Sequence, residues 1–466
     1  MTPYLLIDFG TTSTKAALTA LDTGAFSHIQ RYPAIPNCAA PAGHYEIPPD
    51  AIRQRFLDIC AEYWKITPFQ GIVLCAEMHG FIVLDGDCKP LTNYISWKDE
   101  RSVQTIDGRD TFSLISDALG PRFRDIIGMR PRSGFPLMNL THLLRTTAIP
   151  PNSRVVSLPG WLSLCSGNSL YKGHPTTLIA MAFYDVHSNE PSDDLLALVR
   201  DLTGQTFQLD APAADGEISG YLYLNDERVP IYAGVGDHQC SVLGACNIPR
   251  ETISINLGTG SQVACIDGFT EREDIEIRPY FGGGKLAAVT HLPAGRALED
   301  FIGFLDEVAR SAGAAAPDFW SMLAALDEEE ILKANLDFNL STFPSARHYR
   351  DGGHIARIKE GTFTLHHYLA SLLKSFATQY LEIIDQLDPH HRAQRCILSG
   401  GIAQNLPLLH HLLGRLSQRE ALDATPLDES FIGLRTLALI ADGRADNYLA
   451  AQAIFGRQCH IEEDKS

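Results

Sequence analysis

Helix-like and strand-like hydrophobic patterns alternate along most of the chain. Residues 50–66 repeat apolar positions with the spacing of an amphipathic helix that buries one face. The members of that face are Ile52, Phe56, Ile59, Cys60 and Tyr63. Short apolar runs at 4–7, 71–76 and 81–84 predict buried strands. This alternation predicts an α/β protein.

The C-terminal third continues the same alternation. A long amphipathic pattern over 363–387 predicts a helix that ends at Asp388-Pro389. A strand is expected at 396–398, followed by a turn at Gly400-Gly401 and a leucine-rich helix from Asn405.

Two segments about 250 residues apart share one local pattern. Residues 6–13 and 255–261 each read as a strand with a polar residue near its end, then Gly-Thr, a small residue and Ser. Each is followed by a second apolar strand, so each predicts a tight β-hairpin. The repeat predicts two halves of similar build, divided into domains 1–247 and 248–466; coincidence between short turns is the alternative.

Composition narrows the function. The 466 residues are 45% hydrophobic, and the formal charge of −18 argues against nucleic acid or an anionic membrane as partner. The start lacks the basic and apolar regions of a signal peptide, and no apolar run reaches a membrane-spanning length. The ten cysteines form no CxxC pair, so we expect free thiols in a reducing, cytoplasmic protein.

Both predicted hairpins have the chemistry of a phosphate-binding turn. Glycine lets the backbone bend so that successive N–H groups face an anion, and hydroxyl side chains add donors. The candidates for the ATP phosphates are Gly10, Thr11, Thr12, Ser13, Lys15, Gly258, Thr259 and Gly260. Asp8, at the end of the first strand, is a candidate ligand of Mg²⁺ through water; a turn-capping aspartate is the alternative.

Six motifs in order make the chain resemble the FGGY carbohydrate kinases of the actin-like ATPase superfamily. They are DFGTTSTK (8–15), EMHG (77–80), SWKDER (96–101), GVGDHQCSVLG (234–244), INLGTGSQVA (255–264) and LSGGIAQN (398–405), and they cover nearly the whole length. The resemblance implies two actin-like ATPase (ribonuclease H-like) domains with a central cleft. It also implies ATP and Mg²⁺ as cofactors, and phosphorylation of a terminal ketose hydroxyl.

The GDHQCSV and PYFGGGKLAAVTHL segments look most like the sedoheptulokinase branch. Pentulose kinases of the xylulokinase or ribulokinase type are the alternative. The chain has Glu77 where xylulokinase-like members usually have glutamine, which leaves the identity of the sugar open.

Asp237 is the candidate catalytic base. Phosphoryl transfer needs the proton of the attacking hydroxyl removed, and Asp237 follows a glycine turn at the start of a predicted helix. A carboxylate there gains from the helix dipole. An N-cap aspartate without a catalytic role is the alternative.

The remaining site residues follow from the other motifs. A polyol needs directional hydrogen bonds and an apolar platform. The sugar-binding candidates are Glu77, Met78, His79, Trp97, Asp99, Arg101, Asp237 and His238. The alternatives are a buried His79 bonded to backbone, a Trp97 that packs in the core, and a surface ion pair between Asp99 and Arg101.

The adenosine is expected to meet Gly400, Gly401, Gln404 and Asn405, where the glycine turn gives flat access; an ordinary helix cap is the alternative. Gly433 is a further candidate for closing the adenine pocket. The expected partners are therefore a sugar and ATP, with the oligomeric state open and a homodimer one candidate. An actin-like ATPase such as a chaperone, or a sugar sensor, is the competing class, but it has no use for the EMHG, WKDER and GVGDHQ segments.

Overall fold

The computed structural model describes residues 2–168, 171–343, 352–423 and 427–456, which form two compact units. The first unit comprises residues 1–246, 277–285 and 425–466, and the second comprises residues 247–276 and 286–424.

The first unit is built on a mixed sheet. Its strands β1 (Tyr4–Phe9), β2 (Ser13–Ala20) and β3 (Ala25–Pro33) form an antiparallel meander. On the other side of β1 the order continues with β5 (Ile72–Ala76), β14 (Glu227–Tyr232) and β13 (Ile218–Leu224). The strands β1, β5 and β14 run parallel, so their carboxyl ends lie at one edge.

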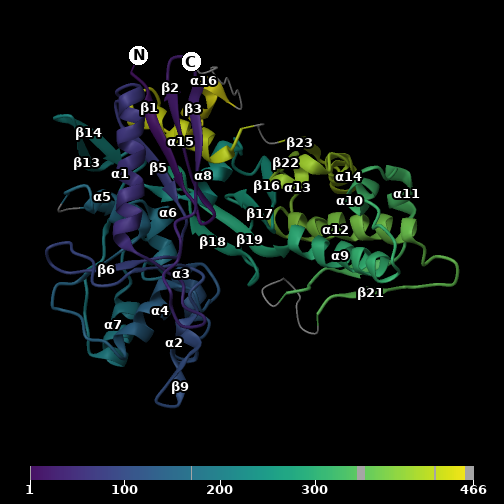
Figure 1. Ribbon diagram of the computed structural model, residues 1–466, viewed down its shortest axis with the longest axis horizontal. Coiled ribbons are helices and arrows are strands. Elements are labelled where there is room, and N and C mark those ends of the chain that lie inside the picture. The colour runs from purple at the N-terminus through teal and green to yellow at the C-terminus, as the bar shows by residue number, and fades with distance from the viewer. Residues whose placement is uncertain (1, 169–170, 344–351, 424–426, 457–466) are drawn as a thin grey trace. The chain divides into compact units, whose positions relative to one another are not determined.

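Helices cover both faces of this sheet (Figure 1). Leu5, Ile7 and Phe9 of β1 share a core with helix α1 (Pro49–Ile66) and helix α5 (Leu158–Leu164). Because side chains alternate along a strand, Asp8 points to the opposite face. There helix α15 (Glu429–Ala441) packs on β1 and β5, and helix α8 (Asp237–Gly244) packs on α15.

A helical region extends the first unit beyond its sheet. Helices α2 (Thr111–Leu119), α3 (Arg122–Ile127), α4 (Pro136–Leu144) and α7 (Asp193–Thr203) surround a second hydrophobic core. Phe81, next to β6 (Ile82–Leu84), and the fully buried Phe135 belong to that core, which therefore anchors the segment between β5 and α2.

The second unit repeats the sheet pattern. Strands β16 (Thr252–Leu257), β17 (Gly260–Ile266) and β19 (Lys285–Pro293) form an antiparallel meander. Strand β22 (Arg395–Ser399) runs parallel to β16, and β23 (Glu420–Asp423) runs parallel to β22. Helices α9 (Gly295–Ser311), α12 (Leu365–Leu387) and α14 (Leu408–Ser417) complete its hydrophobic core.

The α/β class and the repeated Gly-Thr hairpin are confirmed, because both sheets join an antiparallel meander to parallel strands in the same order. The helix predicted over 363–387 is α12, which begins at Leu365. The leucine-rich helix expected from Asn405 is wrong at its start. A short helix, α13 (Gly401–Asn405), comes first, and α14 begins at Leu408 after Pro407.

The predicted domain division needs one correction. The second unit begins at Asn247, one residue before the predicted start at 248, and 277–285 and 425–466 group with the first unit and not with a C-terminal domain. The physical reason is close packing of α15 on α8. The Cα of Gly433 faces the Cys240 carbonyl, and a Cβ there would lie far inside van der Waals contact.

The described part of the chain contains no helix long and apolar enough to cross a membrane. Each cysteine in it is a free thiol, as predicted, and Cys459 lies outside the described residues.

Candidate active site

The first Gly-Thr hairpin carries an ion-pair network at its base. The β1–β2 register places Asp8 opposite Lys15, and Lys15 Nζ lies 3.0 Å from Asp8 Oδ2. Lys15 Nζ also lies 2.5 Å from Asp428 Oδ2, and the Ser430 hydroxyl donates to Asp8 Oδ2 at 2.8 Å. Asp8 Oδ1 is buried and accepts no hydrogen bond from the described residues. One carboxylate oxygen is thus held in place while the other is left for a ligand.

The network shifts the pKa values of Lys15 and Asp428. Burial lowers the pKa of Lys15, but Asp8 and Asp428 more than offset it, so this pKa lies above its ordinary value. Burial raises the pKa of Asp428, and the Lys15 ammonium outweighs it, so this pKa lies below the usual range. At neutral pH the lysine is therefore charged and held between two carboxylates.

Asp237 opens α8 at the carboxyl edge of the first sheet. The short strand β15 (Val235–Gly236) pairs with β5 at Cys75, and Cys75 is also the β5 partner of Asp8. Burial, and after it the negative charge of Asp8, raises the pKa of Asp237 to about 7. The hydrogen bond from the His238 N–H and the charge of Arg278 act in the opposite direction and lower this pKa. The register thus places Asp8 and the start of α8 at Asp237 on the two sides of the same end of β5.

The EMHG segment follows β5 directly. The Glu77 N–H donates to Phe9 O at 3.0 Å, and both Glu77 carboxylate oxygens accept hydrogen bonds, from Thr11 and from Tyr94. His79 has a φ of +65°, its Nδ1 lies 2.9 Å from Ala180 O, and its ring stacks on Phe135 at 4.8 Å. The Met78 and His79 side chains are only partly buried, so they can still meet a ligand.

Trp97, the aromatic residue of the WKDER segment, is exposed at 41%. Its indole Nε1–H donates to Thr11 Oγ1 at 3.1 Å, and Lys98 Nζ lies 5.6 Å from the centre of its ring. An aromatic face that is open to solvent and fixed at its edge fits the platform predicted for a sugar.

Asp99 and Arg101 are buried, at 0% and 5% exposure, so the alternative of a surface ion pair is wrong. Arg101 Nε and Nη2 donate to the two Asp99 oxygens at 2.8 Å each, and Nη2 also reaches Glu46. Asp99 Oδ2 accepts a further bond from the Tyr45 N–H at 2.8 Å. The pair therefore holds the loop that presents Trp97.

The second unit gathers its own predicted residues at the ends of β16 and β22, which pair in parallel. The turn Gly258-Thr259 rests on the start of α9, since Gly258 O and Thr259 O accept from the N–H groups of Gly295 and Arg296 at 3.1 Å. Gly400, with a φ of +90°, packs against Leu257 O.

A Cβ on Gly401 would meet nothing within 4 Å, and Gln404 and Asn405 are exposed on α13. The predicted phosphate turn of this unit and its predicted adenosine residues thus adjoin. Gly433, the further candidate for the adenine pocket, lies in the first unit, and α8 fills the space beside its Cα.

Sequence reasoning missed four residues that the fold brings to this site: Tyr94, Arg278, Asp428 and Ser430. Arg278 Nη1 lies 3.2 Å from His238 Nδ1. A signal existed only for Tyr94. Its hydroxyl fills the space where Gly80 of EMHG would carry a Cβ, so that glycine marks a close approach.

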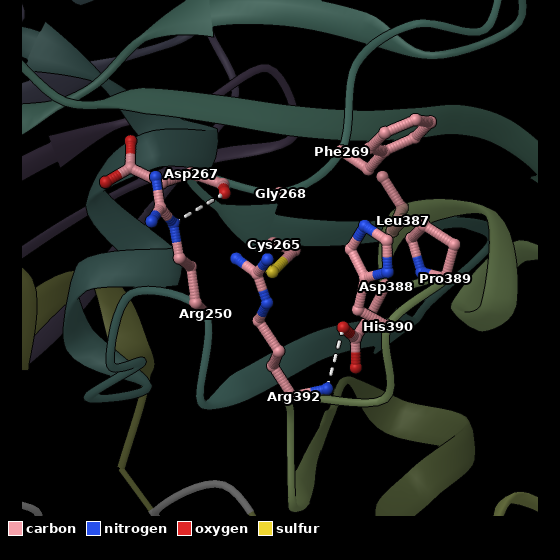
Figure 2. A pocket seen from close by; sticks show the side chains of 10 residues that line it. All are labelled: Arg250, Cys265, Asp267, Gly268, Phe269, Leu387, Asp388, Pro389, His390 and Arg392. Atoms are coloured by element: carbon pink, nitrogen blue, oxygen red, sulfur yellow. Dashed lines mark hydrogen bonds between the residues drawn. The ribbon is translucent and has the colours of Figure 1, made fainter.

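A pocket of about 210 Å³ lies elsewhere in the second unit (Figure 2). It is lined by Arg250, Phe269, Leu387, His390 and Arg392, next to the start of β16 and the end of β17. The Gly258-Thr259 turn lies at the other end of these strands, roughly 20 Å away at 3.3 Å per residue. None of the predicted site residues lines this pocket.

The fold matches solved sugar and polyol kinases. Glycerol kinase from Plasmodium falciparum with ADP superposes with a TM-score of 0.81 at 15% identity, over 100% of this chain and 95% of that one. Ligand-bound xylulose kinase from Lactobacillus acidophilus gives 0.78 at 15% identity, over 97% and 92%. These likenesses establish an α/β two-domain fold of the actin-like ATPase type.

The sequence comparison identifies the family. The model of the FGGY family of carbohydrate kinases, N-terminal domain, matches residues 3–244, just over half of the chain. Xylulose kinase from Bacillus subtilis (strain 168) is 25% identical over an alignment of 304 residues that covers 60% of this chain and 56% of that protein. The chain belongs to the FGGY family of carbohydrate kinases, as its motifs predicted.

Proposed function

We propose that this protein transfers the γ-phosphoryl group of ATP to a terminal hydroxyl of a ketose. The observation that carries the proposal is Asp237, a carboxylate at a helix N-terminus beside Asp8 with its pKa raised to about 7. A general base works best when its pKa lies near the working pH. Family membership supplies the class of reaction.

Asp237 would accept the proton of the sugar hydroxyl as that oxygen attacks the γ-phosphorus. The proton moves to the carboxylate, the new O–P bond forms, and ADP leaves with the electrons of the broken bond. The His238 N–H already donates to Asp237 Oδ1 at 2.7 Å, which leaves the other oxygen for the substrate. Asp237→Asn should remove phosphoryl transfer and keep sugar binding.

Asp8 fits a role at Mg²⁺. Its buried Oδ1 lacks a hydrogen bond while Oδ2 is held by Lys15 and Ser430, and Mg²⁺ prefers oxygen ligands and retained waters. When bound, Mg²⁺ neutralises developing charge on the phosphates. Asp8→Asn should raise the Mg²⁺ concentration needed for half-maximal rate; an unchanged requirement would remove Asp8 from the metal site.

The second Gly-Thr turn remains a proposal for phosphate binding, with Gly401, Gln404 and Asn405 proposed for the adenosine. The open space over Gly401 supports this, because a nucleoside needs close access to backbone. Bulk at this position tests it: Gly401→Val should weaken ATP binding and leave sugar binding unchanged.

The sugar itself is proposed from the Trp97 platform and the partly buried Met78 and His79. Sedoheptulose is the first candidate on the resemblance of GDHQCSV, and the xylulose kinases among the similar proteins support pentuloses equally. A panel of heptuloses, pentuloses, glycerol and gluconate, with coupled detection of ADP, separates them.

The expected result is little ADP without acceptor and one sugar phosphate per ADP with one ketose. ATP turnover that ignores every sugar would overturn the proposal and favour an actin-like ATPase. Asp237→Asn is the negative control, because it should transfer no phosphoryl group to any acceptor.

A further inference from the structure

A continuous hydrogen-bond chain links the first phosphate turn to the segment that presents Trp97. The Trp97 indole N–H donates to Thr11 Oγ1 at 3.1 Å, and the Thr11 hydroxyl donates to Glu77 Oε2. The Tyr94 hydroxyl donates to Glu77 Oε1 at 2.8 Å. All four residues belong to the first unit. One carboxylate therefore joins three segments: 10–12, 77–80 and 94–101.

Glu77 is buried, at 6% exposure, and each of its oxygens has a partner. A buried carboxylate is costly unless hydrogen bonds satisfy it, so breaking either bond is opposed by the cost of leaving that oxygen alone. Tyr94 is fully buried beneath Gly80, which fixes the far end of the chain. The series of hydrogen bonds is thus rigid from Tyr94 to Thr11, and its exposed end is the Trp97 indole.

The direction of these bonds decides what Thr11 can do. A threonine hydroxyl has one proton to donate, and Thr11 gives it to Glu77 while accepting from Trp97. It follows that the Thr11 hydroxyl proton is committed to Glu77 and is not available to an anion at the turn. Movement of the indole toward a sugar would pull on the same oxygen that orients the turn.

We propose that Glu77 is a positioning residue that couples sugar binding at Trp97 to nucleotide binding at the Gly10-Thr11-Thr12 turn. This inference rests on the proposed function, because it takes the turn as a nucleotide site and Trp97 as a sugar site. It also explains the glutamate at 77: a carboxylate accepts from two hydroxyls, whereas a glutamine amide has one accepting oxygen and an NH₂ group.

The test compares Glu77→Gln with the wild type and a matched control. Glu62→Gln is the control, since Glu62 on α1 also accepts a hydrogen bond from a tyrosine hydroxyl, Tyr32 at 3.0 Å, away from the site. The readout is a coupling factor: the Kd of a non-hydrolysable ATP analogue without sugar, divided by its Kd with saturating sugar. The melting temperature of each variant is measured alongside.

Coupling between two sites on one protein is typically about 5- to 150-fold. We expect the wild type and Glu62→Gln to fall in that range and Glu77→Gln to fall to within about twofold of unity. Trp97→Phe removes the indole N–H, which breaks the hydrogen bond to Thr11, and it keeps an aromatic ring. This variant should therefore lose the coupling as well. If Glu77→Gln does not fold, Trp97→Phe still tests the inference.

The outcomes are distinguishable. Wild-type coupling retained in both Glu77→Gln and Trp97→Phe would overturn the inference and leave the kinase proposal intact. A wild type that transfers phosphoryl to no sugar in the panel would overturn the proposed function itself.

Discussion

Lys15 Nζ donates a 2.5 Å hydrogen bond to Asp428 Oδ2, although 413 positions of the chain separate the two residues. Asp428 also caps α15 by accepting from the Ser430 N–H at 3.2 Å, and Ser430 passes a hydrogen bond on to Asp8. One helix N-terminus near the end of the chain thereby fixes both charged residues at the base of the first hairpin.

Asp428→Asn should isolate the charge of this contact, because asparagine caps a helix as well as aspartate does. With one carboxylate removed, the pKa of Lys15 falls towards its ordinary value and the ammonium pairs with Asp8 alone. We expect a loss of about 1 kcal/mol in stability and a fall of roughly ten- to a hundredfold in kcat/KM for ATP.

Asp318→Asn is the control for that substitution. Asp318 caps α10 (Phe319–Ala324) by accepting from the Ser321 N–H at 3.0 Å, and no salt bridge of Asp318 is present among the described residues. An equal fall in kcat/KM for ATP in both variants would assign the effect to helix capping and not to the charge on Lys15.

The pH dependence of transfer should follow Asp237. The base must be ionised, and its pKa is raised to about 7, so kcat/KM for the sugar should fall about tenfold per pH unit below that value. Arg278 stabilises the carboxylate, so Arg278→Gln should raise the pKa and move the acid limb to higher pH. Arg278→Lys keeps the charge and should leave the limb in place; a shift to lower pH in Arg278→Gln would contradict the assignment.

Asp237 should also reduce stability at neutral and higher pH. Its folded pKa lies above the unfolded value of 3.8, so the folded state holds a proton that the unfolded state loses between pH 4 and about 7. Stability is therefore lost as pH rises through that window. Asp237→Asn should be more stable than the wild type by on the order of 2–4 kcal/mol at pH 8 and no more stable at pH 3.5, as measured by chemical denaturation.

The contact between α8 and α15 needs glycine at two positions. A Cβ at Gly244 would collide with Glu429 O, and one at Gly433 would collide with Cys240 O, both backbone atoms that cannot move aside. Gly433→Ala should therefore destabilise the protein by roughly 1–3 kcal/mol or more through overpacking.

Gly303→Ala is the matched control, because Gly303 lies inside α9 and a Cβ there meets nothing within 4 Å. Alanine in a helix interior stabilises by about 0.5–1 kcal/mol relative to glycine. Equal unfolding midpoints for the two variants would show that the α8–α15 contact is looser than described.

The local pattern of turn residues and hydrophobic positions was enough to predict the elements that carry the motifs. The two Gly-Thr hairpins, α1 with its buried face and the helix opened by Asp237 depend on turn residues and hydrophobic spacing within a few positions.

The partners inside the site could not be found in this way. Ser430 reaches Asp8, and Asp428 reaches Lys15, only because α15 returns to the first sheet after the whole second unit. Arg278 arrives on a segment that leaves that unit for nine residues. Glu77 shows the same limit: sequence placed it at a sugar, while packing gave both of its oxygens to Thr11 and Tyr94. Short-range chemistry determined the strands and turns, and hydrogen bonding between distant segments decided which polar atoms remain available.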